Sequence, residues 1–124
     1  MRTAVEHYEA KLDHEIDSWD LNEARQRGEA IVVIDTRSRA AYDAEHLPGA
    51  VSLPHAGLNE SSTANFDHEP LYVTYCDGIG CNASTKGALQ MSQLGFRVKE
   101  LIGGLDWWRR DGYPTERAVV QINS

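Results

Sequence analysis

The chain has 124 residues, of which 41% are hydrophobic and 25% are charged, and its formal net charge is −7. This length and composition are typical of one globular domain. The negative charge argues against a nucleic-acid partner or an anionic membrane, because no basic stripe is present to bind phosphates.

Targeting signals and the two cysteines also narrow the class of protein. No apolar run approaches the roughly 20 residues of a membrane span, and the N-terminus lacks the apolar core of a signal peptide, so we expect a cytoplasmic protein. Cys76 and Cys81 lie in one short segment. A disulfide between them would close a very small loop and stabilise the fold little. We therefore expect two reduced thiols with a chemical role.

The N-terminal region is predicted to contain two helices. Residues 3–16 carry apolar side chains at spacings of three and four, which is typical of a surface helix. Trp19 and Leu21 are compatible with a very short strand. Asp20 is a candidate N-cap for a second helix that ends at Gly28. We expect residues 1–17 to form a helical extension and residues 18–124 to form the domain.

Strands and helices are predicted to alternate through the rest of the chain. The expected strands are 31–35, 50–54, 71–75 and 98–102. The expected helices are 38–46, 83–94 and 105–111, with loop and at most one helical turn over 55–69. The continuous apolar run IVVID at 31–35 is typical of a strand that is covered on both faces. This order predicts an α/β fold, in which helices flank both faces of a parallel sheet.

The segment that begins at Cys76 carries the strongest indication of chemistry. Ligands of parallel sheets bind beyond the carboxyl ends of the strands. Gly78 and Gly80 allow positive φ and let several backbone N–H groups point inward, so that the loop and the following helix N-terminus form a nest for an anion. These surroundings favour a thiolate at Cys76, which is a nucleophile. The alternative is a buried structural cysteine, which leaves the two glycines unexplained.

Cys81 has two interpretations that the sequence leaves open. It is either a resolving thiol, which attacks a persulfide or sulfenate on Cys76, or a loop residue without a redox role. A zinc site is not expected, because the chain has no second cysteine pair and no matching histidines. We predict neither a metal nor a cofactor.

Three motifs in the correct order resemble the rhodanese homology domain over about residues 18–117. They are IDTRSRAAYDAEHLPGAVSLPH at 34–55, TYCDGIGCNAS at 74–84 and LIGGLDWWRRDGYPTE at 101–116. The resemblance implies a parallel sheet of about five strands and transfer of sulfane sulfur through a persulfide on Cys76. The loop that would bind the substrate or anion consists of Asp77, Gly78, Ile79, Gly80, Cys81 and Asn82.

The loop departs from the pattern C-x-x-G-x-R/S/T that is common in the family, and indicates a subgroup with the loop C-D-G-x-G-C-N. Its seven residues, 76–82, resemble the length found in the phosphatase and arsenate-reductase branch. Loops of that branch end in an arginine that binds an oxyanion with two hydrogen bonds. Asn82 cannot replace that arginine and Asp77 adds negative charge, so phosphatase activity is not expected. Lys86 is the nearest cation after the loop and is a candidate support.

Other residues have simpler interpretations. The resemblance implies that Asp35 and Arg37 hold the end of a strand together, with Arg37 near the rim of the site. His46 is expected to pack and hydrogen-bond rather than to transfer protons. Of the adjacent Trp107 and Trp108, one is expected in the core and the other near the surface, where it edges the pocket or a partner.

Three functions remain open from the sequence. The first is a sulfurtransferase that moves sulfur from thiosulfate or a persulfide to cyanide or a thiol. The second is a persulfide carrier or redox protein that uses Cys76 and Cys81 with a protein acceptor, and the third is a non-catalytic binding module. The oligomeric state is open too, because the stripe of Tyr8, Leu12 and Ile16 is either a solvated helix face or a contact with a second subunit.

Overall fold

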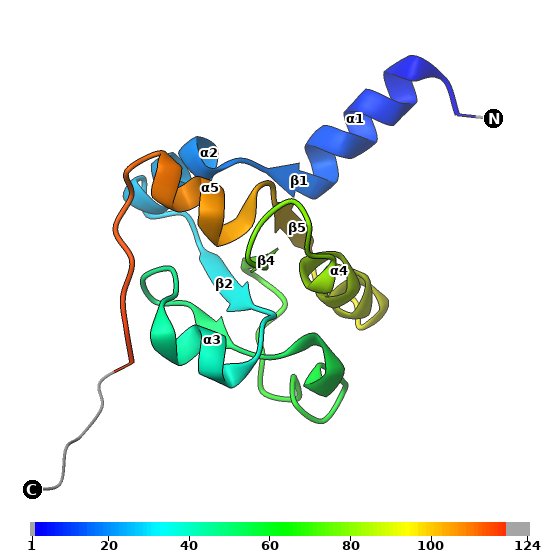
Figure 1. The fold of residues 1–124 in the computed structure, drawn as a ribbon. Coiled ribbons are helices and arrows are strands. Elements are labelled where there is room, and N and C mark those ends of the chain that lie inside the picture. Colours follow the sequence, from blue (N-terminus) through cyan, green and yellow to red (C-terminus); the bar gives the residue numbers. More distant parts are fainter. Residues whose placement is uncertain (1, 119–124) are drawn as a thin grey trace, which may run out of the picture.

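The structure is a computed structural model that describes residues 2–118. It contains a single α/β domain built on a five-stranded sheet in the order β1-β5-β4-β2-β3 (Figure 1). All neighbouring strands run parallel, which confirms the predicted fold class. The strands are β1 (Glu15–Ile16), β2 (Ile31–Asp35), β3 (Val51–Ser52), β4 (Leu71–Tyr75) and β5 (Val98–Leu101).

Helices cover both faces of this sheet, as Figure 1 shows. They are α1 (Ala4–His14), α2 (Ser18–Gln26), α3 (Arg39–Ala44), the 3₁₀ turn η1 (His55–Gly57), α4 (Ala83–Gln93) and α5 (Gly104–Arg110). Successive side chains of a strand point to opposite faces. On β2, Val33 therefore joins the core beneath α2 and α5, where Trp108 is buried. Ile34 joins the core beneath α4, where Met91 is buried.

The predicted boundaries near the N-terminus were wrong in two places. The first helix ends at His14, and the next two residues pair with β5 as strand β1. The short strand expected at Trp19 and Leu21 is part of α2. The N-cap of α2 is Asp17, whose carboxylate accepts the N–H of Asp20 at 2.7 Å. The capping side chain satisfies an N–H that has no partner inside the helix, and this starts the helix before Trp19.

Strand β3 is shorter than the predicted range 50–54. It is an edge strand, and its register with β2 joins Ile34 to Val51 and Asp35 to Ser52. Pro54 has no N–H to continue the ladder. The predicted N-cap of α3, the helix that precedes this strand, is confirmed, because Ser38 Oγ accepts the N–H of Ala41 at 3.2 Å.

Helix α1 stands away from the sheet (Figure 1) and buries none of its residues. The division into residues 1–17 and 18–124 stays a prediction. Within residues 2–118, no helix combines the length and apolar character needed to cross a membrane.

Candidate active site

Cys76 follows directly after β4, which lies in the centre of the sheet between β5 and β2. The side chain is buried, with 2% of its surface exposed. The loop after Cys76 leads into α4, whose first turn is fixed to β4 because Thr74 Oγ1 donates to the carbonyl of Ser84 at 2.9 Å. No side chain caps the N-terminus of α4. The predicted order of strand end, cysteine, loop and helix start is therefore present.

The sulfurs of Cys76 and Cys81 are joined in a disulfide, so the expectation of two reduced thiols was wrong for this structure. The loop folds back on itself because the N–H of Cys81 donates to the carbonyl of Gly78 at 3.2 Å. The two Cα atoms are consequently 6.1 Å apart, which is within the range that a disulfide spans. The catalytic role of Cys76 stays a prediction.

The loop packs against Gly103 and Gly104. Gly103 is the N-cap of α5, and Gly104 is its first residue. Both have positive φ, 80° and 55° respectively. A Cβ on Gly104 would overlap the carbonyl of Cys76 and lie 3.0 Å from the nitrogen of Gly78. This close approach lets the N–H groups of Leu105 and Asp106 donate to the carbonyls of Cys76 and Asp77, at 3.0 and 2.8 Å.

Neither Gly78 nor Gly80 uses the positive φ that glycine allows. Gly78 is needed for space instead, because a Cβ there would lie 3.3 Å from Cβ of Asp106. The sequence presented Gly103 and Gly104 only as part of the motif at 101–116. The signal that indicates their role is a pair of glycines directly before a helix, at the end of a strand next to β4.

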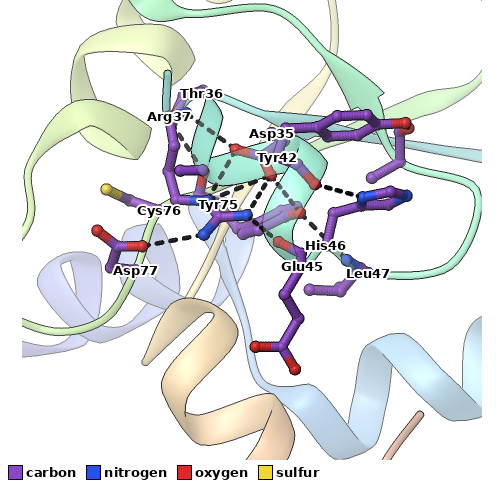
Figure 2. Close-up of polar contacts among 12 residues, drawn as sticks. Asp35, Thr36, Arg37, Tyr42, Glu45, His46, Leu47, Tyr75, Cys76 and Asp77 are labelled. Atoms are coloured by element: carbon purple, nitrogen blue, oxygen red, sulfur yellow. Dashed lines mark hydrogen bonds and ion pairs between the residues drawn. The ribbon is translucent and has the colours of Figure 1, made fainter. Parts of the chain in front are cut away.

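Arg37 links the end of β2 to the cysteine loop, as Figure 2 shows. Its Nη2 is 2.7 Å from Asp35 Oδ2 and its Nη1 is 3.1 Å from Asp77 Oδ1. Its Nη2 also donates to the carbonyl of Glu45. Burial alone would lower the pKa of Arg37, but the hydrogen bonds and charge of Asp35 outweigh it and raise that pKa. Arg37 thus stays charged, and the expected pairing of Asp35 with Arg37 is present.

Tyr75 completes this network from β4. Its hydroxyl donates to Asp35 Oδ2 at 2.6 Å and accepts the N–H of Leu47 at 3.2 Å. Burial, together with the hydrogen bond to Asp35, raises the pKa of Tyr75 far above its ordinary value. Sequence reasoning missed Tyr75, because no local pattern relates it to Asp35, which lies 40 positions away.

An open depression of about 780 Å³ lies over the loop. Its cations come from α5, where Arg109 and Arg110 line it together with the half-exposed Trp107. Trp108 is buried, so the predicted division between the two tryptophans is confirmed. The lining consists of Asp77, Gly78, Ile79, Gly80, Cys81, Asp106, Trp107, Arg109 and Arg110.

Acidic side chains partly neutralise the cations of this depression. Arg110 Nε is 3.1 Å from Asp106 Oδ2, and Arg109 Nη1 is 2.8 Å from Glu45 Oε1. Lys86 and Asn82 are exposed and do not line the depression. The sequence pointed to Lys86 because it is near in the chain, whereas Arg109 and Arg110 are near in space.

His46, near this region, has structural surroundings. His46 stacks on Tyr42 with ring centroids 3.8 Å apart, and its Nδ1 lies 2.6 Å from the carbonyl of Tyr42. This confirms the prediction of packing and hydrogen bonding. Within residues 2–118, no three side chains of His, Cys, Asp or Glu are grouped to hold a metal ion.

The fold and the site define a class of α/β proteins with a cysteine at the carboxyl end of the central strand of a parallel sheet. In this class a loop and a helix N-terminus follow the cysteine. The family model described as the rhodanese-like domain matches residues 18–111. The chain belongs to the rhodanese-like domain family.

Two curated proteins and one solved structure illustrate the range of relatives. A thiosulfate sulfurtransferase, GlpE, of Coxiella burnetii is 32% identical over 104 residues, which are 83% of this chain and 90% of that protein. An HTH-type transcriptional regulator of Mycobacterium tuberculosis, Rv0324, is 31% identical over 100 residues, 81% of this chain. The chain spans 43% of that regulator.

The solved structure is the BH2092 protein of Bacillus halodurans. It is 43% identical with a TM-score of 0.88, and the match covers 92% of this chain and 84% of the other.

Proposed function

We propose that the reduced protein is a sulfurtransferase that carries sulfane sulfur as a persulfide on Cys76. The main support is the position of Cys76 at the carboxyl end of β4, at the start of the loop that leads into the uncapped N-terminus of α4. Helix N-termini and loop N–H groups stabilise anions. The relatedness to proteins named thiosulfate sulfurtransferases adds support for thiosulfate as a donor.

The reaction begins when the thiolate of Cys76 attacks the outer sulfur of thiosulfate. The new bond joins the Cys76 sulfur to this outer sulfur, the sulfur–sulfur bond of thiosulfate breaks, and sulfite leaves with the bonding electrons. The persulfide anion then passes its outer sulfur to cyanide, which becomes thiocyanate, or to a thiolate, which becomes a persulfide. Loop N–H groups stabilise the charge as it moves between sulfurs.

Arg109 and Arg110 provide the positive charge that attracts a dianionic donor to the depression. The negative charge of Asp77 is compensated by Arg37, since these side chains form an ion pair at 3.1 Å. This pairing explains how an acidic residue directly after the nucleophile is compatible with an anionic donor.

Mass spectrometry of the intact protein tests the proposal. Reduced Cys81→Ser protein, treated with thiosulfate and freed of excess reagent, is expected to gain the mass of one sulfur atom. The same protein with Cys76→Ala added is expected to gain nothing. Absence of the added sulfur with thiosulfate and with a glutathione persulfide donor would remove the proposal.

A protein acceptor is a second candidate for the outgoing sulfur. Ile79 and Trp107 are 86% and 46% exposed on the same depression, and exposed apolar side chains beside a site favour protein contacts. Mutating Ile79 to Ser should then leave turnover with cyanide intact. Transfer to a protein acceptor should fall.

A non-catalytic binding module is the remaining alternative, and the reactivity of Cys76 distinguishes it from an enzyme. The rate of alkylation in the Cys81→Ser variant should reach half its maximum well below pH about 8.5 if the thiolate is stabilised. A midpoint at the ordinary value favours the module. The C-D-G-x-G-C-N subgroup and the cytoplasmic location remain predictions.

A further inference from the structure

We infer that Cys81 resolves the persulfide on Cys76, so that the sulfur leaves as hydrosulfide and the enzyme is left in the disulfide form. The inference rests on the proposed persulfide and names what happens to it when no acceptor intervenes. The observation behind it is the bond between the Cys76 and Cys81 sulfurs, formed within the loop that carries the nucleophile.

The two sulfurs are joined within the loop between β4 and α4. Cys81 comes directly before Asn82, the N-cap of α4, and its N–H is held by the carbonyl of Gly78. The backbone on the Cys76 side is held by Leu105, whose N–H donates to the Cys76 carbonyl at 3.0 Å. A thiol fixed beside its target reacts far faster than a dilute thiol in solution.

Burial of Cys76 also favours attack by Cys81 over attack by a thiol from solution. Its side chain is 2% exposed, whereas Cys81 is partly exposed and lines the open depression. Thiosulfate and an outside acceptor alike must reach Cys76 past the loop, whereas Cys81 is joined to it in the structure. The inner sulfur of the persulfide, which is the Cys76 sulfur itself, is the atom to which Cys81 is joined in the structure.

The reaction balances without a further reagent. The thiolate of Cys81 attacks the Cys76 sulfur, the bond to the outer sulfur breaks, and hydrosulfide leaves. In total, the dithiol protein and thiosulfate give the disulfide protein, sulfite, hydrosulfide and one proton. The two thiols are oxidised by two electrons, and the sulfane sulfur of thiosulfate is reduced by two.

A dithiol reductant must then restore the thiols, and the exposure of the two sulfurs decides its route. Its thiolate attacks the accessible sulfur of Cys81, and Cys76 leaves as the thiolate. A stabilised thiolate is the better leaving group, and Cys76 is bonded to Cys81, which comes directly before the uncapped N-terminus of α4. The second thiol of the reductant then displaces Cys81 and closes its own disulfide.

A single-turnover experiment tests the inference. Reduced wild-type protein, freed of reductant, is mixed with one equivalent of thiosulfate. The expected products are one equivalent each of sulfite and hydrosulfide, and a protein mass lower by two hydrogen atoms. The Cys81→Ser variant is expected to retain the added sulfur and to release sulfite without hydrosulfide.

A matched control separates proximity from the number of thiols. Cys81→Ser combined with Ser92→Cys keeps two cysteines, but position 92 lies near the far end of α4, about 15 Å along the helix axis from the loop. This variant is expected to behave like Cys81→Ser. Release of hydrosulfide from it would show that any second thiol suffices, and would overturn the assignment to Cys81.

Other outcomes distinguish this inference from the proposed function. A stable persulfide on wild-type Cys76, without hydrosulfide, overturns the inference and leaves the sulfurtransferase intact. No added sulfur on Cys81→Ser overturns both. For the recovery step, dithiothreitol is expected to restore repeated turnover of the wild type, and a monothiol such as glutathione to give a mixed disulfide at Cys81. A mixed disulfide at Cys76 instead would overturn the proposed route.

Discussion

Gly104 lies against the backbone of Cys76, so closely that a single added methyl group would overlap the Cys76 carbonyl. The contact joins the start of α5 to the end of β4, and it determines how the cysteine loop leaves the sheet. The position also has a φ of 55°, which is unfavourable for residues that carry a Cβ. The shape of the site therefore depends on a residue outside the loop.

Replacing Gly104 with alanine is expected to lower the free energy of unfolding by at least about 2 kcal/mol, because the overlap adds to the cost of a left-handed backbone. Denaturant unfolding measures this loss. The control is Gly112→Ala, where φ is 83° but the added Cβ meets nothing within 4 Å. That variant should lose about 1 kcal/mol and keep sulfur transfer. Equal losses in both variants would contradict the role of the Cys76 contact.

Replacing Arg37 with alanine is expected to destabilise the fold by about 3–5 kcal/mol, because the buried carboxylate of Asp35 loses its partner. The side chains of Arg37 and Asp35 are 7% and 0% exposed. The matched control is Arg39→Ala, which breaks an ion pair whose side chains are 71% and 44% exposed and should cost less than about 1 kcal/mol. Thermal unfolding compares the two. A small effect at Arg37 would show that Asp35 is satisfied without it.

Replacing Tyr75 with phenylalanine is expected to cost about 1–3 kcal/mol at neutral pH, because the N–H of Leu47 loses its acceptor. The free energy of unfolding is also expected to fall at alkaline pH because of Tyr75. Burial and the hydrogen bond to Asp35 raise the pKa of Tyr75 in the folded state, so above pH about 10 the unfolded chain releases a proton that the folded chain retains.

The contribution of Tyr75 is therefore fully present below pH about 10 and is lost as the pH rises above it. Urea unfolding at several alkaline pH values should show a steeper decline for the wild type than for Tyr75→Phe. Part of the decline should remain in the variant, because the pKa of Tyr72 is raised too, chiefly by burial. Identical slopes would contradict the assignment to Tyr75.

Replacing Arg110 with alanine is expected to raise the KM for thiosulfate about five- to tenfold, with a smaller change in kcat, because the depression loses a cation that attracts the donor. Steady-state kinetics with cyanide as acceptor measures this. Lys86→Ala is the control, since Lys86 does not line the depression, and should change KM by less than about twofold. A larger rise in KM for Lys86→Ala than for Arg110→Ala would identify Lys86 as the supporting cation. Added salt should reduce the difference between wild type and Arg110→Ala, because it screens exposed charges.

The sequence determined the features that depend on neighbouring residues. The run IVVID, the cap at Ser38 and the order of strand, cysteine, loop and helix each follow from local side-chain chemistry, and each is present in the structure. The start of α2 was misplaced because Asp17 and Asp20 are both suitable N-caps, and the cap in the structure is Asp17.

Only the tertiary structure decided what surrounds Cys76. Gly104 and Arg110 come from a distant part of the chain, and no local pattern relates them to the loop. Tyr75 directly precedes Cys76, but its partner Asp35 lies 40 positions away. The parallel sheet brings them together because it aligns the carboxyl ends of its strands at one edge. The bond between Cys76 and Cys81 is likewise a matter of folding, since the turn at Gly78 rather than the spacing itself brings the two sulfurs within reach.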